Sequence, residues 1–267
     1  MENFNEKQYN ANSKIFDNYV KSNFDMQASG IKRKYYHTYR VAEVCHKIGK
    51  KLGLDEKLSY DIGLLHDYAR FPQWKKFASF DDYSTFDHAD EGARLLFEEG
   101  GIKAFDIKKE DYLLIKLSIK FHNKFAIDEN YLKEEIEKDK TNTHSFDEIL
   151  SYCKLSRDGD KMDLFNMISQ GDLSVHLNQD GYTPSIMTSI KNHSSVVTKD
   201  MRTKLDRLFC FIAFLFDINY RESIEEMSVK DYFECIKAKY GNILNEKDSQ
   251  TLSNVMQEVL PYFNDVA

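Results

Sequence analysis

Apolar residues recur along most of the chain at spacings of three and four, which is the period of an amphipathic helix. The segment 32–52 follows this pattern, because Val41 and Ile48 fall on one helical face. His37 lies on the same face. Only three prolines and eleven glycines occur in the 267 residues, and spacings of two, the period of a strand, are rare. The pattern therefore predicts an all-α fold.

The next helix is expected to begin at Asp55, whose side chain suits the N-cap position. Leu58, Ile62 and Leu65 then form its apolar stripe. The same periodicity predicts later helices at 88–99, 110–123, 145–156, 160–168, 199–219, 228–240 and 246–263. Polar stretches without this period predict loops at 77–87, 124–144 and 169–198.

The composition, 42% hydrophobic and 30% charged, is that of an ordinary globular chain long enough to bury a sizeable core. The first ten residues, MENFNEKQYN, lack the basic start and apolar run of a secretory signal. The longest apolar stretch, 208–218, is too short to span a bilayer. We therefore expect a cytoplasmic protein without a membrane partner.

The net charge of −7 argues against a nucleic-acid polymer as partner, because such proteins usually present a broad basic face. A small anionic substrate needs only a local basic patch. The four cysteines are far apart and form no CxxC pair, so neither a zinc knuckle nor a disulfide framework is indicated.

Several chargeable residues occupy positions that should face inward. His37 lies on an apolar stripe, and His66 and Asp67 end the stripe of the next helix in LLHDYARF. A single inward histidine is more often a hydrogen-bonded core residue than a ligand. Three more inward residues join them, namely His88, His122 and Asp160. Each unpaired buried group costs several kcal/mol, and a metal centre would satisfy all of them at once.

This ordered set resembles the HD superfamily of metal-dependent phosphohydrolases. The strings that carry the resemblance are YYHTYRVAEVC, IGLLHDYARF, DHADEGARLLFEEG, IKFHNKF and LSRDGDKMD. The resemblance implies a single HD-type helical domain over 1–267, with a metal-binding core at 32–168 and a helical extension at 199–267. In the last string the family has alanine before the ligand aspartate. Gly159 stands there, so Asp160 is the expected ligand, Asp158 the alternative, and Asp163 a helix-surface acid or a residue behind the ligands.

Six side chains on one ion would leave no position for water or substrate, so two ions fit better. By resemblance, His37, His66, Asp67 and Asp160 bind the first ion. Asp67, His88 and His122 bind the second, which makes Asp67 a bridge. Imidazole and carboxylate ligands suit two divalent transition-metal ions, with iron or manganese expected first and cobalt or zinc as alternatives.

The residue three positions after the HD aspartate is Arg70. In the family's alarmone hydrolases and deoxynucleotide monophosphatases this residue is acidic and catalytic. A basic residue resembles instead the binuclear branch of cyclic-dinucleotide phosphodiesterases and dinucleoside polyphosphate hydrolases, where it helps to hold substrate. A guanidinium offers a planar fork to an anionic oxygen. The alternative is an Arg70 salt bridge at a helix end.

Two other basic residues are expected near the substrate, Arg33 and Lys161, although Lys161 could equally pair with Asp160. We assign catalytic roles to Asp67, Arg70 and Lys161, and substrate contacts to Arg70, Lys161 and Arg33. The remaining histidines match no block and are expected at the surface; they are His46, His144, His176 and His193.

The resemblance implies hydrolysis of a phosphoester or phosphoanhydride in a small nucleotide-like molecule by metal-activated hydroxide. Mixed-valent di-iron oxygenases of the same superfamily share the ligand order and are the alternative. A non-catalytic nucleotide-binding module is a further alternative, and a weaker one because none of the six ligands is missing.

Overall fold

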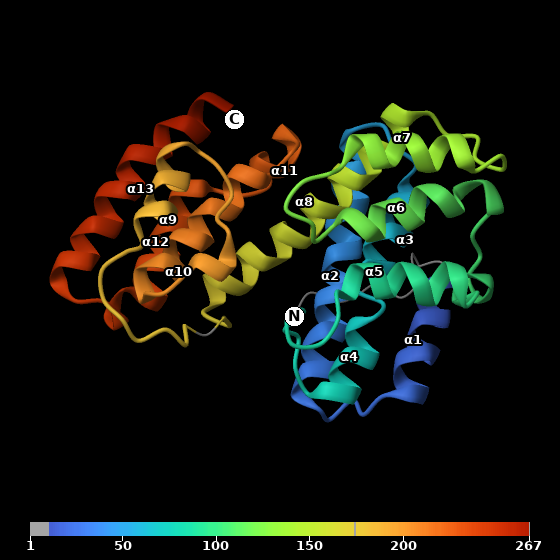
Figure 1. The fold of residues 1–267 in the computed structure, drawn as a ribbon, viewed down its shortest axis with the longest axis horizontal. Coiled ribbons are helices and arrows are strands. Elements are labelled where there is room, and N and C mark those ends of the chain that lie inside the picture. The colour runs from blue at the N-terminus through green and yellow to red at the C-terminus, as the bar shows by residue number, and fades with distance from the viewer. Residues whose placement is uncertain (1–10, 174, 267) are drawn as a thin grey trace. The chain divides into compact units, whose positions relative to one another are not determined.

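The computed structural model describes residues 11–173 and 175–266, and within these ranges every named element is a helix (Figure 1). The all-α fold is thereby confirmed. The chain divides into two compact units, Met1–Asp160 and Lys161–Ala267. The single domain expected over 1–267 stays a prediction. Among the described residues, each helix is too short or too polar to cross a membrane.

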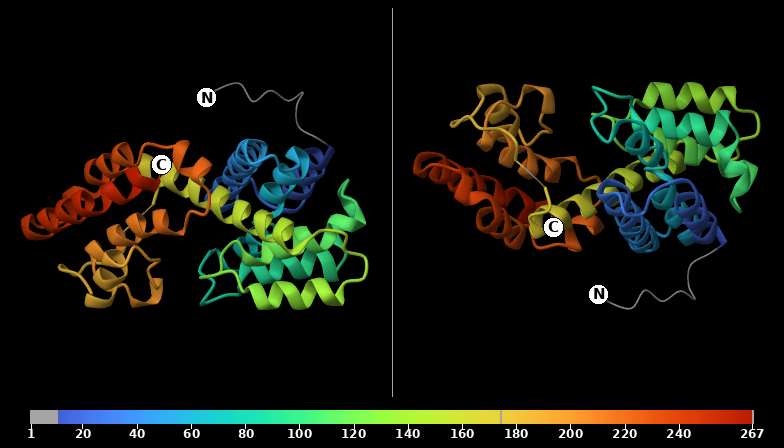
Figure 2. Two further views of the ribbon diagram at one scale, coloured as in Figure 1. Left: turned by 90° about the horizontal axis from the view of Figure 1, so that it is seen from above. Right: turned by 90° about the horizontal axis from the view of Figure 1, so that it is seen from below.

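The first unit contains an extensive antiparallel contact between α2 (Ser29–Lys51) and α3 (Glu56–Leu65). Asp55 caps α3 as expected, because its side chain accepts a hydrogen bond from the Leu58 backbone N–H. The other helices of the unit are α1 (Ala11–Asn23), α4 (Arg70–Phe77), α5 (His88–Ala93), α6 (Tyr112–Phe121), α7 (Glu129–Lys138) and the first part of α8 (Phe146–Gln170). Figure 2 shows α1 and α2 in blue and α6 and α7 in green on opposite sides of that part of α8.

The backbones of α2 and α3 meet closely at Gly63. A Cβ atom at this position would lie 2.7 Å from Ala42 Cα and 2.9 Å from the Val41 carbonyl oxygen, closer than real Cβ atoms come. Glycine is therefore required for this approach. His37 lies about one turn before Val41 on α2, and His66 lies about one turn after Gly63 at the end of α3. Because the two helices are antiparallel, their close approach at Gly63 brings these two side chains within reach of each other.

The expectation of separate helices at 145–156 and 160–168 is wrong, because α8 runs without a break through both. Gly159 lies inside the helix, where a side chain would collide with Cys45 Sγ on α2. The glycine thus serves close packing of two helices and does not end one. Asp163 is 2% exposed, so the helix-surface alternative for this acid is also wrong.

Two predicted loops contain helices. α7 lies within 124–144 and has Leu132 as its single fully buried residue, so its apolar period is weak. α9 (Pro184–Lys191) lies within 169–198 and buries only Ile186 and Ile190. Tertiary contacts of a few side chains stabilise these short helices. The loop at 77–87 is confirmed, since α4 ends at Phe77 and α5 begins at His88.

The second unit encloses an apolar core of its own. Its helices are the end of α8, α9, α10 (Lys204–Ala213), α11 (Arg221–Glu225), α12 (Val229–Tyr240) and α13 (Glu246–Val266). The helix expected at 199–219 is shorter, because Thr203 and Asp206 form a capping box that starts α10. Asp206 is fully buried there, and its carboxylate accepts hydrogen bonds from the backbone N–H groups of Thr183, Arg202 and Thr203.

Candidate metal centre

Five of the six predicted ligands occupy helix positions that point them into the first unit. His37 lies in the middle of α2, and His66 and Asp67 follow α3 directly. His88 opens α5 and His122 follows α6. All five are between 0% and 3% exposed. The sixth residue, Asp160, lies within α8 and keeps 30% of its side chain exposed.

One group of donor atoms gathers around Asp67 Oδ2. His37 Nε2 lies 3.3 Å from this oxygen and His66 Nε2 lies 3.4 Å from it. The two imidazole nitrogens are 3.3 Å apart. Asp160 Oδ1 approaches the same nitrogens, at 3.2 Å from His37 and 3.8 Å from His66. Donors bound to one ion at about 2.1 Å lie about 3 to 4 Å apart, so these separations suit a shared ion.

A second group gathers around the other oxygen of the same carboxylate. His88 Nε2 lies 3.3 Å and His122 Nε2 lies 3.7 Å from Asp67 Oδ1. The nitrogens of the two histidines are 2.9 Å apart. The two oxygens of Asp67 therefore face two different pairs of histidines, and each triple of residues could hold a metal ion.

The outer nitrogens of His66, His88 and His122 each lie at hydrogen-bond distance from an oxygen. His66 Nδ1 lies 2.6 Å from the Gly63 carbonyl oxygen, and His122 Nδ1 lies 2.6 Å from the Ile119 carbonyl oxygen. His88 Nδ1 lies 2.6 Å from Asp82 Oδ2. Carbonyl and carboxylate oxygens only accept hydrogen bonds, so each Nδ1 carries the proton and each neutral ring turns an unprotonated Nε2 inward.

This arrangement fits a cation. Burial lowers the pKa of His66 and lowers that of His88 to about 4, so both rings are neutral near pH 7. The lone pair of His88 Nε2 then points toward His122 Nε2, 2.9 Å away. Burial alone would raise the pKa of Asp67, but Lys34 and His66 beside it hold the pKa well below its usual range. Neutral imidazoles around a charged carboxylate are the donor set that transition metals prefer.

Comparison with protein families agrees with this geometry. The family model of the HD domain matches residues 35–158. The chain carries an HD domain. HD domains are in general metal-dependent hydrolases that bind divalent metals, which the resemblance of the sequence blocks also implies. Comparisons with curated proteins and with solved structures give no match. Assignment to the binuclear branch stays a prediction.

The matched range contains the four histidines and Asp67 and ends two residues before Asp160. The Asp160 carboxylate lies within 4 Å of His37 and His66, which supports it as the sixth ligand. Burial alone would raise the pKa of Asp160, but its contact with His37 holds the pKa well below the usual range. Asp160 thus offers a charged carboxylate next to the matched range, and its role as ligand stays a prediction.

Arg70, the first residue of α4, forms the ion pair that the sequence left open as an alternative. Its Nη1 donates hydrogen bonds to Gln73 Oε1, the Phe80 carbonyl oxygen and Asp82 Oδ1, at 2.6, 2.8 and 2.7 Å. Its Nε lies 3.6 Å from Asp67 Oδ1. Within the described part of the chain, Nη2 has no hydrogen-bond partner. One end of the guanidinium is therefore anchored beside Asp67 while the other is available to a ligand.

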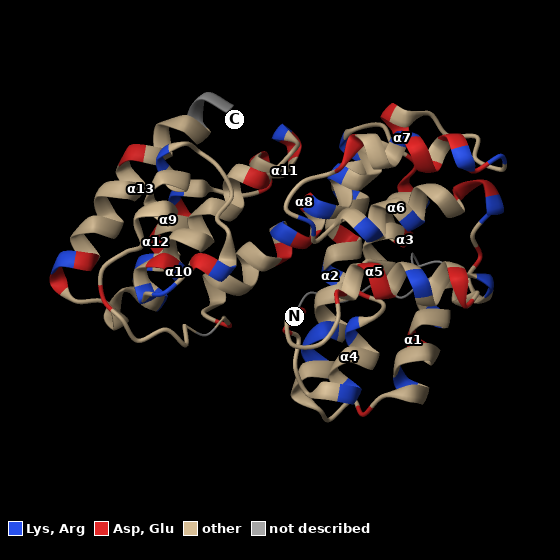
Figure 3. Cartoon of the chain, viewed as in Figure 1, with Lys and Arg blue, Asp and Glu red and all other residues tan. Residues whose placement is uncertain are grey.

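Two more cations lie close to Arg70. The centroid of the Phe80 ring is 5.3 Å from Arg33 Cζ, 5.7 Å from Lys34 Nζ and 5.6 Å from Arg70 Cζ. Lys34 also contacts Asp67 Oδ2 at 2.5 Å. Lys and Arg occupy the start of α2, and α4 carries basic residues without an acid (Figure 3). Basic side chains of α2 and α4 thus gather beside Arg70.

Lys161 has its partner within the second unit. Its Nζ lies 2.7 Å from Asp217 Oδ2, and the residue is 8% exposed. The ion pair with Asp160 that the sequence left open as an alternative stays a prediction. The catalytic and substrate-binding roles of Lys161 stay predictions.

Sequence reasoning missed two residues that contact the ligands, Lys34 and Asp82. Lys34 lies three positions before His37 on the same helix, and that spacing on its own places both on one face. Asp82 lies in the irregular segment between α4 and α5, where no period indicates which acid turns toward His88. The single available signal was the rule that ligand histidines usually donate their other N–H to a carboxylate or carbonyl.

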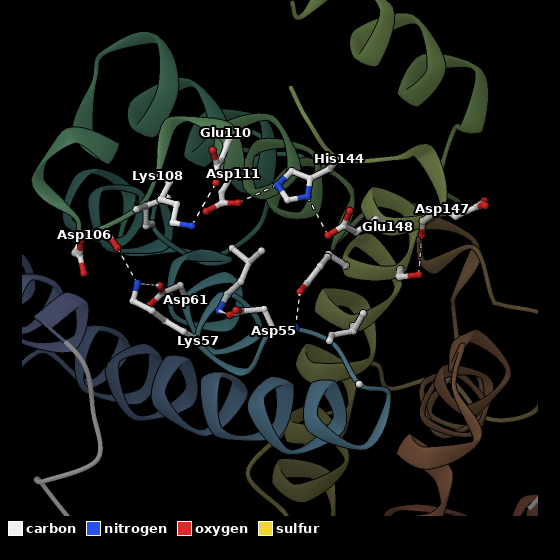
Figure 4. Close-up of a pocket in the computed structure, with 16 residues that line it drawn as sticks. Asp55, Lys57, Asp61, Asp106, Lys108, Glu110, Asp111, His144, Asp147 and Glu148 are labelled. Carbon is white, nitrogen blue, oxygen red and sulfur yellow. Dashed lines mark hydrogen bonds and ion pairs between the residues drawn. The ribbon is translucent and has the colours of Figure 1, made fainter. Parts of the chain in front are cut away.

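A separate cavity of about 780 Å³ lies elsewhere in the first unit, and none of the six predicted ligands lines it (Figure 4). His144, expected at the surface, lines this cavity with 14% of its side chain exposed. Its ring nitrogens lie 2.9 Å from Asp111 Oδ1 and 2.9 Å from Glu148 Oε1. The expectation of a surface position is therefore wrong for His144, which joins two acids across the cavity wall.

Proposed function

We propose that this chain is a metal-dependent phosphohydrolase that cleaves a phosphoester or phosphoanhydride bond in a small nucleotide-like molecule. The observation that carries the proposal is the placement of Asp67, whose two oxygens face two separate pairs of buried histidines. His37, His66, Asp67 and Asp160 would hold one divalent ion, and Asp67, His88 and His122 would hold the other. Iron or manganese is the expected metal, with cobalt or zinc as alternatives.

When bound, two such ions supply an activated water and polarise a phosphoryl oxygen. The protein's own contribution is to orient the ligands and to hold the anion. Hydrogen bonds at Nδ1 fix the rings of His66, His88 and His122 with Nε2 toward the centre.

Arg70 is placed to hold an anionic oxygen of the substrate. Its Nη1 is fixed by three acceptors, so the free Nη2 keeps one direction beside Asp67. Arg33 and Lys34 add positive charge around Phe80, next to the same point. A phosphate compound meets both the metal ligands and these cations, which supports the hydrolase proposal over a function with a neutral substrate.

The proposal is tested with protein purified without oxygen, analysed for metal and offered a panel of nucleotides and nucleotide esters. We expect close to two transition-metal ions per chain and release of phosphate or of a nucleoside monophosphate in the absence of oxygen. His88→Ala should lose about one ion and its activity, whereas His176→Ala, an exposed histidine of the second unit, should keep both. Turnover that requires dioxygen and a reduced di-iron centre, with no phosphorylated compound cleaved, would replace this function with oxygenation.

A further inference from the structure

Asp82 uses both of its carboxylate oxygens at the edge of the proposed metal centre. Oδ2 accepts a hydrogen bond from His88 Nδ1 at 2.6 Å. Oδ1 accepts one from Arg70 Nη1 at 2.7 Å. One acid therefore contacts a predicted metal ligand and the predicted substrate-binding residue at once.

The short contact with His88 is a hydrogen bond and not shared coordination of an ion. Two donors bound to the same ion at about 2.1 Å each lie about 3 Å or more apart, which is longer than the 2.6 Å observed. A carboxylate only accepts, so the proton sits on His88 Nδ1. His88 Nε2 is left with its lone pair, 3.3 Å from Asp67 Oδ1 and 2.9 Å from His122 Nε2.

The position of Asp82 is itself fixed. Gln73, fully buried on α4, donates to Asp82 Oδ1 at 3.0 Å and also to Thr85 Oγ1 and to the Phe86 carbonyl oxygen. Asn123 Nδ2 approaches Asp82 Oδ2 at 3.4 Å from the end of α6. The carboxylate cannot turn away without breaking several hydrogen bonds of the 78–87 segment.

We propose that Asp82 is a positioning residue that couples the second metal group to Arg70. Through Oδ2 it fixes the tautomer and orientation of His88, which sets the affinity of that group for an ion. Through Oδ1 it holds Arg70 by Nη1, which leaves Nη2 toward the substrate. The Arg70 half of this inference rests on the proposed function, and the His88 half does not.

The matched pair of variants is Asp82→Asn and Asp81→Asn, which remove the same charge from neighbouring positions. An amide has one oxygen, so the side chain introduced by Asp82→Asn cannot accept from both His88 and Arg70. Asp81 is exposed and contacts neither. Co²⁺ is titrated into metal-free protein, followed by absorbance and by calorimetry.

For Asp82→Asn we expect one of two Co²⁺ affinities to fall about 10- to 100-fold while the other is kept. Asp81→Asn should match the wild type. Two unchanged affinities in Asp82→Asn would overturn the inference. This readout needs no turnover, so it stands even if no phosphate compound is cleaved.

The coupling to Arg70 is tested by a double-mutant cycle on kcat/KM. At a metal concentration that saturates both groups, Asp82→Asn should reduce kcat/KM more in the wild type than in an Arg70→Ala background, because the arginine that it holds is already gone there. Equal reductions in both backgrounds would overturn the coupling.

A measurement on the wild type covers the case in which Asp82→Asn does not fold. With ¹⁵N-labelled histidine and Zn²⁺ bound, the His88 ring should carry its proton on Nδ1, assigned by comparison with His88→Asn. A proton on Nε2 would contradict the role given to Asp82.

Discussion

Two buried aspartates, Asp67 in the first unit and Asp206 in the second, differ in the groups that surround them. Asp206 stabilises the fold, whereas Asp67 is the proposed metal ligand. Asp67 is 1% exposed and Asp206 is 0% exposed. Asp206 accepts hydrogen bonds from three backbone N–H groups and from the Thr183 hydroxyl. Its charge is met by the protein alone.

The surroundings of Asp67 differ in kind. Its oxygens face the Nε2 atoms of four histidines, and three of those rings hold their proton on the far nitrogen. Lys34 and Arg70 also lie beside this carboxylate. Hydrogen-bond donors of the backbone satisfy Asp206, whereas imidazole nitrogens able to bind a metal face Asp67, so burial of an acid by itself does not reveal function.

The largest expected effect is that of Asp67→Ala. Loss of the carboxylate that faces both histidine pairs should remove both ions and lower kcat/KM by about 1000-fold or more, equivalent to about 4 kcal/mol of transition-state stabilisation. Metal analysis and steady-state kinetics measure this. Asp61→Asn is the matched control, because Asp61 is also 1% exposed in the first unit but accepts from Asn12 and Lys57. Full metal content in Asp67→Ala would contradict the proposed centre.

Asp206→Ala should lower the stability of the fold and leave the metal content unchanged. The backbone N–H groups of Thr183, Arg202 and Thr203 lose their acceptor, and we expect the free energy of unfolding to fall by about 3 kcal/mol. Urea denaturation measures the loss. Metal content should match the wild type, since none of these partners is a proposed ligand. A variant that loses metal while remaining folded would break the distinction between the two acids.

Arg70→Ala tests the substrate side of the centre. Metal content should stay unchanged while kcat/KM falls between about 10-fold and 1000-fold, because the anion loses its guanidinium partner. Arg70→Lys should restore only part of the activity, since lysine keeps the charge without the planar fork. If the ion pair with Asp82 is purely structural, the melting temperature will fall and the kinetics of the folded fraction will not.

The smallest effect concerns Asp87, the N-cap of α5. Its side chain accepts from the Ala89 and Asp90 N–H groups and pairs with Lys124 at 2.6 Å. Burial alone would raise the pKa of Asp87, but Lys124 and these hydrogen bonds lower it. The stabilisation is therefore present above the unfolded pKa of about 4 and is lost as pH falls below it.

In Asp87→Asn the free energy of unfolding should drop by about 0.5 to 1 kcal/mol at pH 7, after allowance for solvent screening. The gap to the wild type should close as pH falls below about 4. Thermal melts from pH 2 to 7 measure it. A gap that widens in acid would reverse the sign assigned to this group.

The sequence allowed the helical class and the inward histidines to be predicted, because both follow from the period of apolar residues. His37, for instance, shares a face with Val41. The break expected between 156 and 160 was wrong, because α8 continues through Gly159, where the missing side chain lets the helix pack against Cys45 Sγ of α2. Helix α7 was missed because a single fully buried leucine gives no period.

Asp82 could not be predicted for a related reason. A histidine ligand needs an acceptor for its outer N–H, but the segment before α5 offers Asp81, Asp82 and Asp87. Which of them reaches His88 depends on how Gln73 holds the segment from α4. Tertiary contacts therefore decide which aspartate reaches His88, and the local sequence does not indicate it.

Gly63 should be unusually intolerant of substitution. The closeness of α2 and α3 at this point sets how far His37 lies from His66, although Gly63 lends only its carbonyl oxygen to the site. Even a methyl group would press on the backbone of Ala42 and shift one ligand against the other. In a library selected for activity, position 63 should therefore accept glycine alone, whereas an exposed position of the same helix, such as Glu56, should vary freely. The distance between two proposed metal ligands thus depends on the absence of a side chain at a position that contributes no side-chain ligand.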